Sequence, residues 1–161
     1  MPELVTRNFG QLVYEDGAPL EFPRGLPAFE NYRRFLAITL PQNEPLVFLQ
    51  SLEESGLCFI TVPVQIVDRD YRLRMPAEDV ELIGLPSGAE PGLGEDVLGL
   101  AVLSVREEGP TANLLAPIVV NLRDRLAVQA VAPESSYSHQ HPLLPAKAAE
   151  DDAAEPCACA R

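Results

Sequence analysis

The stretch that decides the fold class is residues 118–131, IVVNLRDRLAVQAV. Two apolar runs rich in β-branched residues, Ile118–Leu122 and Leu126–Val131, flank the polar pair Arg123-Asp124. Short runs of this kind, joined by a few polar residues, are typical of an antiparallel β-hairpin. The sequence therefore predicts a hairpin near the end of the fold.

Six further apolar runs precede this hairpin along the chain. They are Leu4–Phe9, Gln11–Tyr14, Phe35–Leu40, Leu46–Leu52, Cys58–Val62 and Val97–Val105. The last is almost continuously apolar, which indicates a strand buried on both faces, and Gly10 favours a tight hairpin between the first two. Because 16 prolines are scattered along the chain, few windows are long enough for an extended helix. These patterns predict a mostly β protein, either an antiparallel sandwich or a small barrel.

We expect the helices to be few and short. The best candidate is Pro76–Gly84, which has proline in its first turn, acids near its N-terminus and glycine as a stop. A second short turn is expected at Ala28–Arg34, and a surface loop at 85–95. Residues 145–161 are rich in alanine and acids without apolar periodicity, so we expect one domain at 1–144 and a disordered tail after it.

The composition is that of an acidic protein. The 161 residues include 24 acidic and 12 basic side chains, for a net charge of −12. A field of this sign repels phosphate backbones and attracts basic proteins, so direct nucleic-acid binding is disfavoured. A basic protein partner is compatible with this charge, which by itself is equally explained by solubility. No apolar run is long enough to span a bilayer, no signal-peptide pattern is present, and the three cysteines form no disulfide framework. We therefore expect a cytoplasmic protein without a membrane partner.

No pattern of catalytic residues is recognisable. Gly92-Leu93-Gly94 is followed by two acids, which would repel a pyrophosphate. Gly84–Gly88 has its serine at the wrong offset for a nucleophile elbow. Asp68 and Asp70 lie two residues apart, and we expect Arg69 and Arg72 to pair with them rather than a metal ion. The sequence thus predicts no enzyme activity.

One alternative is a zinc site. His139 and His141 are one residue apart, and Cys157 and Cys159 repeat that spacing near the C-terminus. Two imidazoles and two thiolates could form a tetrahedral site, although structural zinc sites usually have two or more residues between their cysteines. A metal-binding sensor therefore stays open as a second hypothesis, while Cys58, within an apolar run, is expected in the core.

Three strings of the sequence are unusual in combination. They are FPRGLPAFE at Phe22–Glu30, TANLLAPIVVN at Thr111–Asn121 and YSHQHPL at Tyr137–Leu143. In this order, and with Leu49-Gln50-Ser51 between the first two, they resemble the motifs of the flagellar assembly factor FliW family. The resemblance covers residues 3–144.

Two positions depart from the family's pattern. Ala28 stands where the family usually has glycine, so if this position needs a positive φ the loop should be slightly different here. Gln140 stands where the family usually has arginine, which removes a bidentate hydrogen-bond donor.

The resemblance implies a compact, barrel-like antiparallel β domain with one or two short helices, without catalytic activity or a cofactor. It implies two protein partners, flagellin and the basic RNA-binding repressor CsrA, whose repression of flagellin translation FliW proteins relieve allosterically. A monomer is expected before complex formation.

Two sets of residues follow from these expectations. Carboxylates suited to a basic partner are Asp68, Asp70, Glu78, Asp79 and Glu81, which we expect to be exposed. Residues of the three strings with an expected structural role are Phe22, Pro23, Gly25, Pro27, Phe29, Asn113, Pro117, Asn121, Tyr137, His141 and Pro142.

Overall fold

The computed structural model describes residues 2–7, 9–86, 88, 92–131 and 136–143. Within them, the strands are β1 (Glu3–Thr6), β2 (Gly10–Val13), β3 (Leu20–Glu21), β4 (Arg34–Ile38), β5 (Val47–Ser51), β6 (Cys58–Pro63), β7 (Val97–Arg106), β8 (Gly109–Ala112), β9 (Ile118–Asn121), β10 (Leu126–Gln129) and β11 (His141–Pro142). The helices are α1 (Val64–Val67) and α2 (Ala77–Leu82), and a 3-10 turn covers Pro41–Asn43. None of these helices is long and apolar enough to cross a membrane.

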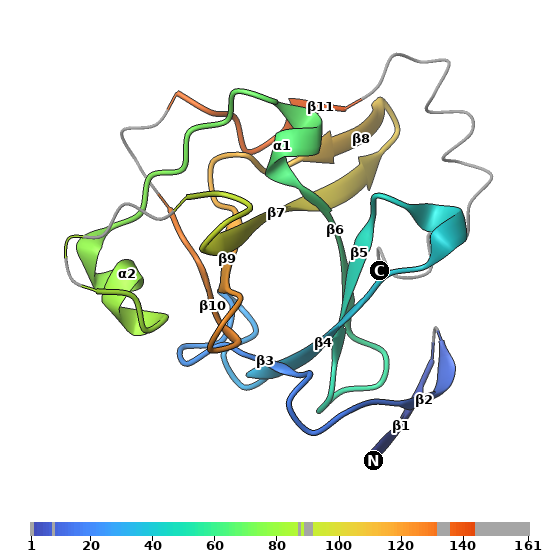
Figure 1. Cartoon of the computed structure of the whole chain (residues 1–161). Coiled ribbons are helices and arrows are strands. Elements are labelled where there is room, and N and C mark those ends of the chain that lie inside the picture. The colour runs from blue at the N-terminus through green and yellow to red at the C-terminus, as the bar shows by residue number, and fades with distance from the viewer. Residues whose placement is uncertain (1, 8, 87, 89–91, 132–135, 144–161) are drawn as a thin grey trace.

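Seven strands close into a barrel in the order β7-β6-β5-β4-β3-β10-β9, with β9 pairing back onto β7 (Figure 1). β7 makes this closure possible because its ten residues serve three neighbours: Val97–Leu100 pair with β9, Leu100–Val102 with β6, and Leu103–Arg106 with β8. The mostly β, barrel-like prediction is confirmed, and the barrel replaces the sandwich alternative.

All ladders are antiparallel except the contact between β3 and β10, where Leu126 lies opposite Glu21. The apolar runs recognised in the sequence all contain strands, but β3, β8 and β11 were missed. Two of these strands have only two residues each, and β8 (GPTA) has no apolar run. Their positions depend on the neighbouring strands, which a local pattern does not reveal.

The β1–β2 hairpin forms a separate two-stranded sheet beside the barrel (Figure 1). Its first strand ends at Thr6, earlier than the predicted Phe9, because the Thr6 hydroxyl accepts a hydrogen bond from the Phe9 N–H at 2.8 Å and donates one to the Gly10 carbonyl at 3.0 Å. These bonds form a turn, and Gly10 follows it with φ of +69°. The hairpin that the sequence predicts at Gly10 is therefore confirmed.

The barrel interior is filled by large apolar side chains. The fully buried members are Phe22, Phe35, Leu49, Leu100 and Ile118. The rings of Phe22 and Phe35 meet edge to face with centroids 5.4 Å apart, which is the arrangement that aromatic pairs prefer. The loop that follows β3 thus contributes directly to the core.

Helix α2 packs against the outer face of β9 and β10. It begins after Pro76 and ends at Leu82, with Ile83 as its C-cap and then Gly84, which has φ of +84°. The helix predicted at Pro76–Gly84 is therefore confirmed. The loop prediction at 85–95 lies partly outside the described residues.

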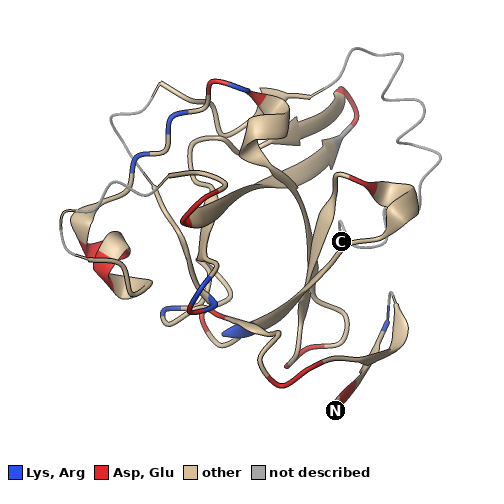
Figure 2. Ribbon diagram, viewed as in Figure 1, with Lys and Arg blue, Asp and Glu red and all other residues tan. Residues whose placement is uncertain are grey.

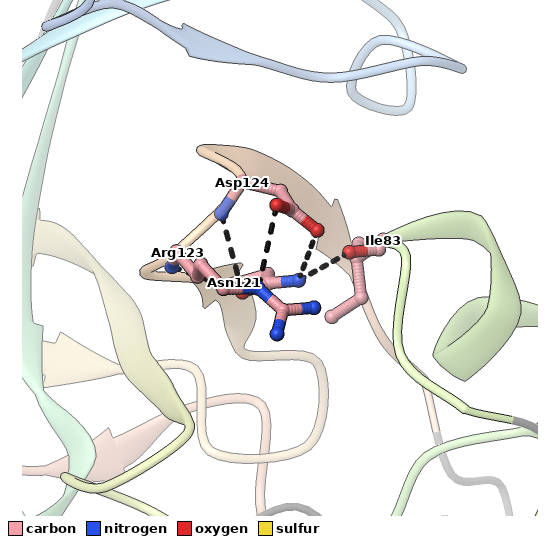
Figure 3. Close-up of polar contacts among 4 residues, drawn as sticks. All are labelled: Ile83, Asn121, Arg123 and Asp124. Atoms are coloured by element: carbon pink, nitrogen blue, oxygen red, sulfur yellow. Dashed lines mark hydrogen bonds and ion pairs between the residues drawn. The ribbon is translucent and has the colours of Figure 1, made fainter.

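The side chain of Asn121 joins α2 to the β9–β10 turn (Figure 3). Its Nδ2 donates to the Ile83 carbonyl at 2.7 Å and to Asp124 Oδ2 at 3.2 Å, while Oδ1 accepts from the Arg123 N–H at 3.0 Å. Asn121 is only 1% exposed. The predicted hairpin at the end of the fold is confirmed, with this amide as its organising group.

Candidate functional site

One end of the barrel opens into a hollow of ≈ 220 Å³, which we call the barrel mouth. Its lining residues are Leu26, Pro27, Phe29, Phe59, Val102, Ser104, Asn113, Ile118, Gln129, His139 and Gln140. All three unusual strings of the sequence contribute to this set. Segments separated by more than a hundred positions therefore meet at one surface, which makes the mouth the strongest candidate site.

The position of the mouth follows from the strand directions. β6 and β9 begin at this end, and β10 ends there, as the register of the pairs with β7 and β9 requires. The side chains of Phe59, Ile118 and Gln129 lie at these strand ends and line the hollow. Mouths of β-barrels are common locations for binding sites because the interior residues become accessible there.

The first string forms the loop between β3 and β4, and its shape depends on two residues with positive φ. Gly25 has φ of +66°, and a Cβ there would lie 2.6 Å from the Glu30 Cα, so only glycine fits. Ala28 has φ of +71°, and its N–H donates to Glu30 Oε2 at 2.9 Å. The position thus keeps the left-handed conformation in spite of the alanine, at a cost in backbone strain.

Phe29 forms the apolar floor of the mouth on the side of this loop. Its ring meets Phe59 edge to face at 5.3 Å, and Phe59 in turn lies 5.9 Å from Phe35 in the interior. Pro23 is half-buried and Pro27 is exposed. The loop therefore continues the core outward, so that a half-buried aromatic ring remains accessible at the mouth.

The second string supplies the amide groups of the mouth. Asn113 Oδ1 accepts hydrogen bonds from the backbone N–H groups of Leu115 and Ala116, at 3.1 and 3.0 Å. Gln129 Nε2 donates to the Ala116 carbonyl at 3.0 Å. These bonds fix the turn before the buried Pro117 and the start of β9. They also fix which end of each amide is oxygen and which is nitrogen.

The third string runs across the outside of the barrel to the mouth. Tyr137 stacks on Tyr71 with ring centroids 4.3 Å apart, and its hydroxyl accepts from the Arg72 N–H at 2.9 Å. The Ser138 carbonyl accepts from the Leu114 N–H at 2.9 Å. His141 and the exposed Pro142 then form β11, which pairs with β8. His139 and Gln140 are thereby held at the mouth.

Tyr71 is the structural support for this arrangement. Its hydroxyl donates to the Leu114 carbonyl at 2.6 Å, inside a buried cluster on the outer face of β6 and β7. Burial raises the pKa of Tyr71 to about 12, with smaller contributions from Tyr137 and Asp68. The phenol therefore stays protonated and keeps its donor role at neutral pH.

None of the five carboxylates that the sequence assigns to a basic partner lines the mouth. Figure 2 shows acidic residues on α2. Glu78 and Glu81 are exposed as expected, but the expectation for Asp79 was wrong. Asp79 is 5% exposed and forms an ion pair with Arg24, which lies in the loop of the first string. Sequence spacing on a six-residue helix could not show this partner.

Asp68 is half-buried and Asp70 is exposed after α1. Asp68 Oδ1 accepts from the Asp70 N–H at 3.0 Å. The ion pairs expected with Arg69 and Arg72 were wrong, since none forms among the described residues. Both arginines are exposed, and an exposed ion pair contributes little.

The described residues contain no group of three or more histidine, cysteine or acidic side chains that could hold a metal ion. His139 and His141 lie within them, whereas Cys157 and Cys159 fall outside, together with the predicted tail. The zinc hypothesis therefore stays a prediction. Cys58 is buried, as expected for a core residue.

Four lining residues lie outside the three strings and were not recognised in the sequence: Phe59, Val102, Ser104 and Gln129. Phe59 lies near the start of β6, Val102 and Ser104 lie on one face of β7, and Gln129 is the last residue of β10. Alternation along each strand identifies such positions, but only after the strand directions are known.

The chain has clear relatives. The FliW protein family model matches residues 3–143. The flagellar assembly factors FliW of Bacillus licheniformis and Bacillus subtilis are 34% and 32% identical over 140 residues, covering 86% of this chain and 94% of each relative.

A crystal structure of the flagellar assembly factor FliW superimposes with a TM-score of 0.77 at 25% sequence identity, covering 91% of this chain and 99% of that one. The sequence match and the fold agree over the region that contains the barrel and its mouth. This chain belongs to the FliW family of flagellar assembly factors.

Proposed function

We propose that this protein binds flagellin in the cytoplasm and, when free of flagellin, binds a CsrA-type RNA-binding repressor and relieves repression of flagellin translation. It acts through protein contacts and without catalysis. Membership of the FliW family carries this proposal. The net charge of −12 supports it, because an acidic molecule attracts a basic repressor and is repelled by the RNA that the repressor holds.

The surface that we assign to the repressor, which we call the acidic outer wall, carries Glu78 and Glu81 of α2 with Asp68 and Asp70 after α1. The exposed Arg69, Arg72 and Arg74 lie among these acids along the chain, so the negative charge is concentrated on α2. Three of the four side chains are exposed, and none is in an ion pair among the described residues. Because these carboxylates are not already paired with a cation, their negative charge attracts a basic protein and increases its association rate constant. Asp79 contributes indirectly, through its ion pair with Arg24.

The test is a titration of the purified protein into a repressor bound to flagellin leader RNA, with RNA release and formation of a protein complex as readouts. We expect RNA release, and association that slows as salt rises, since screening limits the reach of charges to about 8 Å at physiological ionic strength. The double variant Glu78→Lys/Glu81→Lys should reduce the association rate constant by about tenfold and change the dissociation rate constant less.

A matched control is Glu107→Lys/Glu108→Lys, which changes the net charge equally but alters the β7–β8 turn. The control should slow association less than the α2 variant. Equal slowing by both variants would mean that net charge alone acts, and RNA that stays bound at saturating protein without any complex would refute the proposed function.

A further inference from the structure

The barrel mouth differs chemically from the rest of this acidic protein. Its lining contains no carboxylate, lysine or arginine, and His139 is its only titratable side chain. Its half-buried apolar side chains are Phe29, Phe59 and Val102, while side-chain amides and a serine supply its polar groups. A surface without charge on a chain of net charge −12 is suited to an uncharged occupant rather than a basic one.

The two amides fixed by the second string still have unused hydrogen-bonding groups. Asn113 Oδ1 is occupied by two backbone N–H groups, but its Nδ2 has no partner among the described residues. Gln129 Nε2 is occupied by the Ala116 carbonyl, but its Oε1 has no partner there either. The mouth therefore offers one oriented donor and one oriented acceptor. This pair complements a peptide group, which has one carbonyl acceptor and one N–H donor.

The size of the mouth also limits its occupant. At ≈ 220 Å³ it is smaller than the roughly 300–1,000 Å³ of sites that enclose a whole small molecule or cofactor. It has room for a large apolar side chain and the adjacent backbone. The half-buried ring of Phe29, supported from behind by Phe59, provides the flat apolar contact that such a side chain needs.

We propose that the barrel mouth binds a short, uncharged, extended segment of a partner protein, with one large apolar side chain against Phe29 and Phe59 and its peptide group between Asn113 and Gln129. This inference rests on the proposed function. Since the acidic outer wall is assigned to the basic repressor, the partner that supplies the segment is flagellin. The two partners thus use surfaces of different chemistry.

The test fills the mouth from β7. Ser104→Phe places a ring in the hollow, on a strand position where an aromatic residue is favourable. The matched control is Val105→Phe, because Val105 is the next residue of the same strand, faces the opposite side and is 52% exposed. Binding of each variant to purified flagellin and to the purified repressor is measured separately by calorimetry.

We expect Ser104→Phe to weaken flagellin binding by about tenfold or more, as blocking an anchor pocket does, and to leave repressor binding within about twofold of the original. Val105→Phe should leave both unchanged. Wild-type flagellin affinity in a folded Ser104→Phe variant would overturn the inference, and loss of repressor binding alone would overturn the assignment to flagellin. If the unaltered chain binds neither partner, it is the proposed function that fails.

A second measurement needs no substitution. The side-chain NH₂ resonances of Asn113 and Gln129 can be followed by NMR while unlabelled flagellin is added to the full-length chain. Shifts of the Asn113 resonances, with smaller ones for the buried Asn121 amide, are the expected result. Unchanged Asn113 and Gln129 resonances at saturating flagellin would overturn the inference even if Ser104→Phe does not fold.

Discussion

Asn113 and Asn121 belong to the same sequence string but differ in how completely their amides are used. Asn121 joins α2 to the β9–β10 turn through both ends of its amide and is buried. Asn113 uses its oxygen alone and is half-buried at the barrel mouth. A fully bonded buried amide stabilises one structure, whereas a partly bonded amide beside a hollow retains capacity for a partner. The difference separates a structural asparagine from a binding one.

The largest effect is expected for Asn121→Ala. It leaves the buried Ile83 carbonyl and the partly buried Arg123 N–H without their partner, and an unpaired buried group costs about 1–3 kcal/mol. We expect a loss of about 3 kcal/mol in the free energy of unfolding, measured by urea denaturation with an unchanged m-value. A loss below about 1 kcal/mol would break the comparison, because Asn121 would then be no more structural than Asn113.

A smaller effect on stability is expected for Asn113→Ala. Its bonds to Leu115 and Ala116 lie in a half-buried turn where water can replace the lost acceptor, so about 1 kcal/mol should be lost. Flagellin binding should fall as well, by about tenfold. The control is a calorimetric titration of Asn121→Ala with flagellin, at a temperature where that variant is folded. Its affinity for flagellin should be close to that of the unaltered protein.

Two non-glycine residues of the described part of the chain have positive φ and offer a third comparison, Ala28 at the mouth and Arg125 in the β9–β10 turn. Ala28→Gly removes the strain of a Cβ in the left-handed region, which is worth about 1 kcal/mol, and we expect the protein to become more stable by about that amount. Arg125→Gly should stabilise similarly, since its φ of +60° is nearly the same. Thermal melting checks both predictions. A destabilised Ala28→Gly variant would show that the alanine methyl makes a contact that stabilises the protein by more than the backbone strain costs.

The smallest effect at neutral pH concerns Tyr71, whose hydroxyl, like the Asn121 amide, is used within the structure. Folding raises its pKa from 10.0 to about 12 through burial. The resulting stabilisation is complete below pH 10 and is lost as the pH rises towards 12, because the unfolded phenol ionises first. Ultraviolet titration should show a late tyrosine transition that Tyr71→Phe removes. A titration with all tyrosines near pH 10 would contradict this.

The sequence predicts the fold class because the apolar runs are strong local signals. Ile118–Leu122 and Leu126–Val131 are separated by polar residues, and the structure forms the expected hairpin there. Strand β3 cannot be predicted in this way, because its two residues, Leu20–Glu21, form a strand through pairing between positions 21 and 126. Nothing within two residues specifies a neighbour that lies so far along the chain.

The candidate site was predictable only in parts. The three strings were visible in the sequence, but their meeting at one hollow depends on the direction of every barrel strand. Gln129 belongs to an apolar run and has no distinguishing neighbour. In the sequence, Asp79 looks like Glu78 and Glu81, an acidic residue on a short helix. Only the ion pair with Arg24, from the loop after β3, distinguishes it. Side-chain partners separated by 55 positions are set by tertiary packing and not by local spacing.

The short strand β3 has a consequence for how the molecule opens. It connects β4 to β10 with one residue pair to β10 and the bond from the Glu21 N–H to the Arg125 carbonyl at 2.9 Å. Every other junction around the barrel has at least two residue pairs. Local opening begins where fewest bonds must break, so amide hydrogens at this seam should exchange with deuterium before those of β5 and β6. Because the loop after β3 carries Phe22 and Phe29, transient opening of the seam would loosen the floor of the mouth while most of the ladder stays paired.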